Sequence, residues 1–380
     1  MNLSKSNVVL AVLAAVLAIP TTMQLSADAE TFVDVGAIPT MFDGFSSDNV
    51  GLISLAVPAK DQPKSDPNQP NAQPKVAYDK IELRRVDKGW VVHSGSLVNA
   101  PVMKERVESD VFQHLRLIRA DKDAMVQPNA TPEQLAEFGL DDKQAFVIQC
   151  RDQSGQAVVA DLLVGRDAGI GQSGTDAVRG VFVRKSDSSD VVLYEFDKGW
   201  RRDVATDGWL DKVLAKLEPE KIRKVSLRNT ASGGTFTFER GPGKASWQMI
   251  AGPGGVGAVR QIEVENLVQR LRWLAVQDYR VPVQSTNLGQ LGLANPAIEL
   301  EVVVKDGDRD RVLKLGVGNK LADKNEYYVV CNESAFVMTW SAGMVTPFEI
   351  DAKATLFDPA SPDQKNGDDK APAKDEKKGG

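Results

Sequence analysis

An internal repeat is the feature of this sequence that most constrains the fold. The stretch from Lys221 to Phe348 contains, in order, a strand, a strand with a Trp, an amphipathic helix, a Leu-Gly-Leu corner and several short strands. Residues 50–196 run in the same order. Three pairs of positions align: Leu115 with Leu271, Gly139 with Gly292, and Gly165 with Gly316. Such self-similarity predicts two structural copies before any residue chemistry is considered.

Each copy shows short alternating strands and one main helix. In the first copy the helix is expected within residues 101–120, and in the second within residues 259–276. Apolar residues recur there every three or four positions, which places them on one buried face of a helix. These faces consist of Val107, Val111, Leu115 and Ile118 in the first copy and Val264, Leu267, Val268, Leu271, Leu274 and Ala275 in the second. The pattern predicts an α+β fold of two tandem repeats, each a mostly antiparallel sheet with one packing helix.

The domain organisation follows from the repeat and from shifts in composition. We expect a membrane anchor or signal peptide at 1–29, a first α+β repeat at 41–200, a connector at 201–220, a second repeat at 221–350 and a disordered tail at 358–380. Within the connector, Asp207 to Leu217 reads as a short helix. The segment 58–74 is rich in Pro, Gln, Asp and Lys, which predicts a mobile loop. The tail lacks large apolar residues, and its charges nearly cancel.

The amino terminus carries an apolar run behind a single Lys5. Residues 8–25 are uncharged and could span the inner membrane, placing the bulk of the chain in the periplasm. Alternatively, the run is a signal-peptide core, and the small residues around Ala27 and Ala29 mark a cleavage site. The second reading releases a secreted periplasmic protein. Both readings export the remainder of the chain.

Composition excludes several classes of partner. The formal net charge is −6 and no basic stripe is visible, so nucleic acid is not expected as a partner. Two histidines make a histidine-rich metal site unexpected, and we predict neither a metal nor a cofactor. Two cysteines, Cys150 and Cys331, do not make a disulfide framework, and whether they pair stays open. The oligomeric state also stays open.

Two glycine-rich stretches match the G-x-G-x-x-G pattern of dinucleotide-binding loops. Gly252 to Gly257 follows a strand and precedes a helix, as such a loop should. The strand before it is not the continuous apolar run of a buried parallel strand, and the matching loop of the first copy lacks the glycines. We interpret it as a flexible loop that leads into a helix. The second match, Gly169 to Gly174, is followed by a strand and predicts a hairpin loop.

The sequence gives little support for catalysis by an activated serine nucleophile. His93 stands near Ser94 and Ser96, but nothing in the sequence indicates a carboxylate that would orient its imidazole. We interpret His93 as a surface residue. His114 aligns with Arg270 of the second copy, which predicts a flanking polar position on the helix rather than a buried one. No catalytic, cofactor-binding or metal-binding residue is predicted, and the protein is expected not to be an enzyme.

Several segments together resemble a known family. They are MFDGFSSDNVGLISLAV, NAPVMKERVE, EFGLDD and LLVGRD in the first copy, and KIRKVSL, WQMIAG, LVQRLRWL, QLGLANP and LKLGVGN in the second. The sequence resembles the bacterial domain-of-unknown-function 4340 family between Met41 and Phe348. Members are membrane-anchored proteins whose genes often lie beside gliding-motility-type ABC transporter components. The resemblance implies no catalytic residues, because the family has none established.

These observations lead to one expected function and two competitors. The first is a non-enzymatic, membrane-anchored accessory protein of an ABC-type transport system, which would contact the inner membrane and transporter subunits. The second is a cell-envelope module that binds glycan or peptide, suggested by Trp90 and Trp247 at matching strand ends. A hydrolase that uses His93 is the third. The working parts are expected in unshared pieces: the anchor, the loop 58–74 and the surfaces around Gly252 to Gly257.

Overall fold

The computed structural model describes residues 39–62, 76–169, 179–196, 199–230, 233–241, 246–252 and 259–349, together with Leu356. The predicted membrane span 8–25, the cleavage site near Ala29, the tail 358–380 and most of the loop 58–74 lie outside these ranges. Within the described ranges, no helix is both long and apolar enough to cross a membrane.

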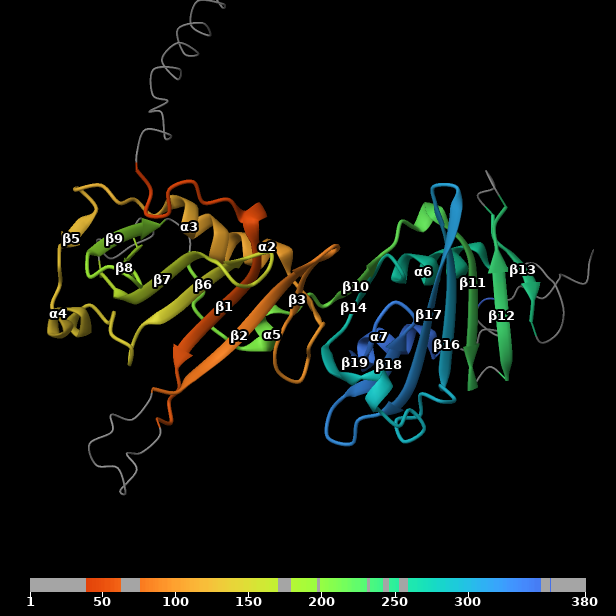
Figure 1. Cartoon of the computed structure of the whole chain (residues 1–380). Coiled ribbons are helices and arrows are strands. Elements are labelled where there is room, and N and C mark those ends of the chain that lie inside the picture. Colours follow the sequence, from red (N-terminus) through yellow and green to blue (C-terminus); the bar gives the residue numbers. More distant parts are fainter. Residues whose placement is uncertain are drawn as a thin grey trace, which may run out of the picture. The chain divides into compact units, whose positions relative to one another are not determined.

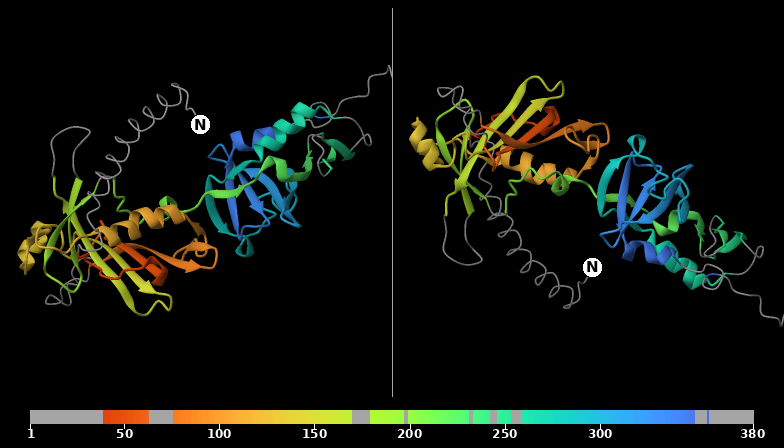
Figure 2. Two further views of the ribbon diagram at one scale, coloured as in Figure 1. Left: turned by 90° about the horizontal axis from the view of Figure 1, so that it is seen from above. Right: turned by 90° about the horizontal axis from the view of Figure 1, so that it is seen from below.

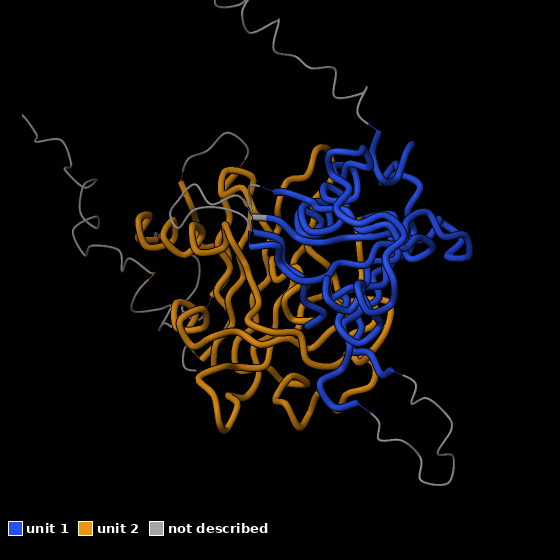
Figure 3. Tube along the Cα trace, turned by 90° about the vertical axis from the view of Figure 1, so that its left-hand side faces the viewer, with its two compact units in different colours: residues 1–88, 104–205 blue, residues 89–103, 206–380 orange. Residues whose placement is uncertain are grey.

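The chain divides into two compact units (Figure 3). Unit 1 comprises residues 1–88 and 104–205, and unit 2 comprises residues 89–103 and 206–380. The segment 89–103 therefore groups with unit 2, although the first repeat is predicted to span 41–200. Two long sheets are labelled in Figure 1, and each unit contributes most of the strands of one of them.

The first sheet has nine strands in the order β4-β3-β2-β1-β6-β7-β8-β9-β5. The paired strands are antiparallel. The strands are β1 (Val50–Pro58), β2 (Tyr78–Val86), β3 (Gly89–Val92), β4 (Pro101–Val102), β5 (Met125–Gln127), β6 (Phe146–Asp152), β7 (Val158–Asp167), β8 (Arg179–Lys185) and β9 (Val191–Phe196).

The second long sheet repeats this order as β13-β12-β11-β16-β17-β18-β19-β15. Its strands are β11 (Ile222–Asn229), β12 (Gly234–Glu239), β13 (Gln248–Ala251), β15 (Asp278–Pro282), β16 (Ile298–Asp306), β17 (Arg309–Lys320), β18 (Glu326–Cys331) and β19 (Phe336–Ser341). A separate pair joins β10 (Val213–Lys216) to β14 (Trp273–Ala275). The prediction of mostly antiparallel, sheet-rich α+β structure is confirmed.

Side-chain alternation explains why these segments form half-buried strands. In β16 the side chains of Ile298, Leu300 and Val302 are buried, while Glu299 and Glu301 point to the opposite face. Successive residues of a strand face opposite sides, so this spacing places one apolar face against the core.

Helices are few and short. Unit 1 has a helical segment that begins as α2 (Lys104–Val107), continues as a π turn, η3 (Glu108–Phe112), and ends as α3 (Gln113–Leu117). Its counterpart in unit 2 is α6 (Gln261–Arg270), and Figure 2 shows each of these helices beside the sheet of its own unit. The remaining described helices are η2 (Ser47–Asn49), α4 (Pro132–Glu137), α5 (Thr206–Trp209), η4 (Pro219–Lys221), η6 (Val283–Ser285), α7 (Ala342–Val345) and η7 (Thr346–Phe348).

Two helices end earlier than predicted. The helix expected over residues 259–276 stops at Arg270, and the following residues form β14. The helix expected over Asp207 to Leu217 stops at Trp209 and is followed by β10. The physical reason is shared, because β10 and β14 pair with each other. Their backbone groups find partners across the sheet, which periodicity in a single segment does not reveal.

The glycine corners, Phe138-Gly139-Leu140 in unit 1 and Leu291-Gly292-Leu293 in unit 2, match closely. Gly139 and Gly292 both adopt left-handed backbone conformations, with φ of 70° and 71°. The N–H of Arg166 donates to the carbonyl of Phe138 at 3.0 Å, and the N–H of Asn319 donates to that of Leu291 at 2.8 Å. The corner of each unit is thus hydrogen-bonded to a long strand, β7 or β17.

This hydrogen bonding corrects the alignment of the repeat. A Cβ on Gly165 would lie 2.3 Å from the carbonyl oxygen of Phe138, and a Cβ on Gly318 would lie 2.3 Å from that of Leu291. The partner of Gly165 is therefore Gly318, and its predicted alignment with Gly316 was wrong by two residues. A shift of two keeps every side chain on the same face, so the apolar pattern alone could not detect it.

Replacing Gly165 or Gly318 by Ala should destabilise the protein by about 3 kcal/mol, because the added methyl meets a fixed backbone carbonyl. Denaturant unfolding followed by circular dichroism measures this. Gly343→Ala is the matched control, since the nearest atom to its Cβ is 3.9 Å away and it lies in helix α7. That change should be neutral or stabilising by about 0.5 kcal/mol. Equal stability of Gly165→Ala and the wild type would contradict the close contact.

Both cysteines are free and buried, Cys150 in unit 1 and Cys331 in unit 2. Burial raises the pKa of each thiol above its ordinary value. Because the thiolate is the reactive form, we expect a thiol reagent to label neither residue in the folded protein and both after denaturation. A count of labelled thiols by mass spectrometry checks this. Fewer than two labelled thiols in denaturant without reductant would indicate a disulfide.

Candidate functional site

A cleft of about 500 Å³ lies in unit 1 between the main helix and the end of strand β9. The helix changes from α to π geometry over Glu108–Phe112, and π turns of this kind are frequent at functional sites. The lining residues are Ser109, Asp110, Gln113, His114 and Leu117 from the helix, and Tyr194, Glu195, Phe196 and Gly199 from β9 and the chain that follows.

Aromatic rings pack together at the base of the cleft. The imidazole of His114 stacks on the indole of Trp200, with ring centroids 4.0 Å apart and planes inclined by 22°. Tyr194 and Phe196 present edges to both rings. Aromatic pairs of this kind contribute about 1 kcal/mol each beyond their buried area. The cluster therefore holds helix α3 and the end of β9 in a defined geometry.

His114 is the polar centre of this cluster. Its Nδ1 lies 3.0 Å from the hydroxyl oxygen of Tyr194, and only 7% of the residue is exposed. Burial lowers the pKa of His114 from 6.5 to about 4, so the imidazole is neutral at pH 7. The prediction of a flanking, unburied position was wrong. Alignment with Arg270 identified the helix face, but Trp200 covers that face from a distant part of the chain.

A buried ion pair fixes the other wall. Arg106 Nε lies 3.0 Å from Asp110 Oδ2, and the guanidinium also contacts Asp203 at 2.7 Å. The indole N–H of Trp200 donates to the carbonyl of Asp110 at 2.8 Å. Breaking such a buried pair is costly because one charge would stay uncompensated. These polar groups thus serve to position the aromatic cluster.

The cleft continues into a second hollow of about 330 Å³ beside the same strand. Leu117, Tyr194 and Glu195 line both hollows. The second hollow is completed by Arg119, Asp123, Ala124 and Leu193. We call the two together the β9 groove.

Unit 2 does not repeat this arrangement among its described residues. The pairing of β18 with β19 places Trp340 where Tyr194 stands in unit 1. Trp340 stacks on Phe348, with centroids 6.2 Å apart, and the two residues are 1% and 2% exposed. The rings close the space that is open in unit 1.

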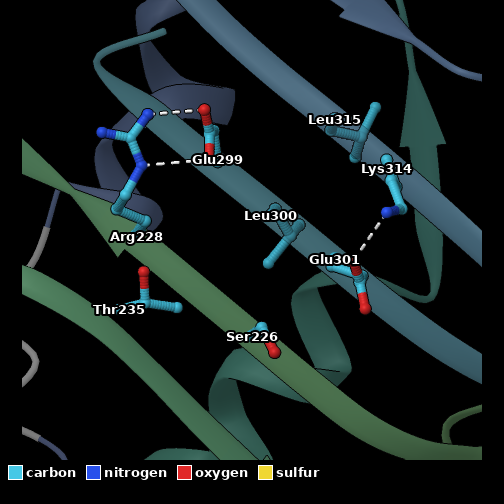
Figure 4. A pocket seen from close by; sticks show the side chains of 8 residues that line it. All are labelled: Ser226, Arg228, Thr235, Glu299, Leu300, Glu301, Lys314 and Leu315. Atoms are coloured by element: carbon cyan, nitrogen blue, oxygen red, sulfur yellow. Dashed lines mark hydrogen bonds and ion pairs between the residues drawn. The ribbon is translucent and has the colours of Figure 1, made fainter. Parts of the chain in front are cut away.

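A different hollow, of about 220 Å³, lies on the sheet of unit 2 (Figure 4). Arg228 makes two hydrogen bonds to Glu299, at 3.0 and 2.5 Å. Lys314 lies 3.0 Å from Glu301 on the neighbouring strand. The remaining lining residues are Ser226, Thr235, Leu300 and Leu315. Its four charges pair with one another across the strands, so the hollow offers little net charge to a ligand.

The residues singled out by sequence do not assemble into a site. His93 follows β3 and is half-buried, and the described structure gives it no hydrogen bond to Ser94 or Ser96. Gly252 packs near the ring of Phe236, while residues 253–258 and most of the stretch Gly169 to Gly174 lie outside the described ranges. The described residues contain no group of three or more His, Cys, Asp or Glu side chains suited to a metal.

The model of the domain of unknown function DUF4340 matches residues 90–286, more than half of the chain, and the protein belongs to this family. The resemblance stated from the sequence motifs is thereby confirmed at the level of the family. Neither the curated proteins nor the solved structures contain a match to the chain.

The burial of His114 predicts a loss of stability in acid. The unfolded chain takes up a proton at the ordinary pKa of 6.5, whereas the folded protein does so only near pH 4. Stability from the neutral imidazole is therefore present above pH 6.5 and is lost as the pH falls towards 4. Between pH 7 and pH 5, the free energy of unfolding of the wild type should fall more than that of His114→Phe.

Urea unfolding at the two pH values measures this difference. Gln113→Ala, an exposed neighbour on the same helix, is the control and should keep the wild-type pH dependence. An equal fall in His114→Phe and the wild type would contradict the burial of a neutral imidazole.

Proposed function

We propose that this protein is a non-enzymatic accessory protein of an ABC-type transport system, anchored in the inner membrane through residues 8–25 and facing the periplasm. We further propose that it contributes to that system by binding a polypeptide partner at the β9 groove. The anchor and the transport link rest on the sequence and on the family resemblance. The groove is the structural observation that carries the binding role.

The buried polar side chains of the groove are already hydrogen-bonded or ion-paired within the protein, which supports a role in binding rather than in proton transfer. His114 contacts Tyr194, and Asp110 contacts Arg106 and the indole of Trp200. A general base works best when its pKa lies near the operating pH, and the pKa of His114 is about 4. These groups are suited to hold a surface in shape.

Apolar exposure at the groove supports a protein partner. Leu117 lines both hollows, and 49% of it is exposed. Phe196 is half-buried at the same cleft. Exposed apolar side chains beside a rigid aromatic cluster are typical of contact sites for other proteins.

The two tryptophans that suggested glycan binding do not support that hypothesis. It rested on Trp90 and Trp247, which are only 4% and 2% exposed. The indole N–H of Trp247 donates to Glu265 at 3.1 Å, and the guanidinium of Arg240 lies over its ring at 4.9 Å. Neither face is available to stack on a sugar, so both residues serve the cores.

Affinity purification of the tagged full-length protein from its native cells, in mild detergent, tests the proposal. Leu117→Asp places a charge on the apolar wall of the groove, and we expect it to reduce recovery of transporter subunits at least several-fold relative to the wild type. Because Leu117 is half exposed, the fold should tolerate the change.

Val158→Asp is the matched control, since Val158 is an exposed apolar residue of unit 1 that lies outside the groove lining. It should recover subunits as the wild type does. Recovery of no transporter subunit with the wild type would overturn the transport role. Equal recovery with Leu117→Asp would overturn the role of the groove.

A further inference from the structure

Strand β9 has a backbone edge that is only partly covered. Its pairing with β8 extends from Val192 to Phe196. On the other side, β5 pairs with Val191 and Val192, and the N–H of Leu193 donates to the carbonyl of Ala124 at 2.8 Å. Backbone groups of alternate residues point the same way along a strand. The N–H and C=O of Glu195 therefore lie on the same edge as those of Leu193, beyond the end of β5.

The counterpart of this edge in unit 2 is used differently. Ser341 occupies the position that corresponds to Glu195, and it is the N-cap residue of helix α7. The next residue, Ala342, begins that helix, and its N–H donates to the carbonyl of Asn325 on the β18 side at 2.9 Å. The strand of unit 2 thus turns into a helix where that of unit 1 continues beside a groove.

The groove around Glu195 has one wall from the helix and one from strand β9. Leu117 and Gln113, both exposed, line the helix side, and Leu193 and Phe196 line the strand side. An antiparallel guest strand would exchange two hydrogen bonds with one residue, because N–H and C=O of a hydrogen-bonded pair face the same partner. Peptides are bound in this way at many open sheet edges.

The charges of the groove indicate the chemistry of the guest. Arg119 is paired with Asp121, and Asp110 is paired with Arg106. Glu195 and Asp123 are exposed, and neither makes an ion pair with any described residue. The uncompensated charge of the groove is therefore negative, and a cationic side chain on the guest would complement it.

From the open edge, the apolar walls and the charge together, we infer that the β9 groove binds an extended peptide segment bearing lysine or arginine, which pairs with the backbone of Glu195 and with its carboxylate. This inference rests on the proposed function, because it specifies the chemistry of the polypeptide bound there. The apolar walls accept the alternate side chains of the guest, and Glu195 and Asp123 receive its cations.

Fluorescence polarisation with two dye-labelled probe peptides tests the inference on the purified protein. One probe is an acetylated and amidated valine–lysine–valine–lysine–valine peptide, and the other carries glutamate in place of lysine. The wild type should bind the lysine probe at least about threefold more tightly than the glutamate probe, the size expected for exposed charge pairs.

Two substitutions of one residue separate the backbone from the charge. Glu195→Gln keeps the edge N–H and removes the charge, so it should reduce the preference for the lysine probe. Glu195→Pro removes the edge N–H as well as the charge but leaves the ladder to β8, a position where proline is tolerated. Compared with Glu195→Gln, which lacks the same charge, it should bind the lysine probe about tenfold more weakly, consistent with one lost hydrogen bond. Glu137→Gln, an exposed acid on α4, is the control and should bind as the wild type does.

The outcomes separate this inference from the proposed function. Equal binding of both probes by the wild type would overturn the cationic guest, and equal binding of the lysine probe by a folded Glu195→Pro and by Glu195→Gln would overturn strand addition. If Glu195→Pro does not fold, the Glu195→Gln comparison and the two probes still decide on charge. Absence of binding by either probe would overturn the inference, whereas the proposed function depends separately on recovery of transporter subunits.

Discussion

The contact between a strand glycine and the carbonyl of the residue before the corner glycine is the constraint on which both units depend. Gly165 admits the carbonyl of Phe138, and Gly318 admits that of Leu291, at distances that no Cβ would allow. The contact fixes the corner against the long strand, β7 or β17. From there the neighbouring strands follow in the same order in both sheets.

Much of this architecture could be predicted from the sequence because it depends on local patterns. Alternating apolar residues indicate strands, and Gly139 marks a left-handed corner that other residues avoid. Thr131 also caps helix α4 as its sequence indicates, with its hydroxyl accepting from the N–H of Gln134. The exact register of the repeat was not predictable, because a shift of two residues leaves the apolar pattern unchanged.

The candidate site was mostly missed, and the reason is physical. The cleft forms where helix α3 meets strand β9 and Trp200, and the helix lies far from those two in the sequence. The periodicity of apolar residues within a single segment does not indicate which other segment will pack against it. Tyr194, Phe196 and Trp200 are close together in the sequence, but this gave only a weak indication of a site. The second copy also has aromatic residues, Trp340 and Phe348, and there they stack and leave no cleft. Comparison of the two copies predicted functional parts in the segments that only one copy has, but it did not single out the β9 groove.

The grouping of residues 89–103 with unit 2 has a consequence for how the protein can be dissected. The chain enters unit 2 after Lys88, returns to unit 1 at Lys104, and leaves it again after Ala205. Three covalent crossings therefore join the units, where a simple tandem array would have one. A single proteolytic cut cannot release either unit, and a fragment that ends at Ala205 would carry β3 and β4, which pair in the first sheet although they group with unit 2. The two units repeat one strand order, yet the chain passes between them three times.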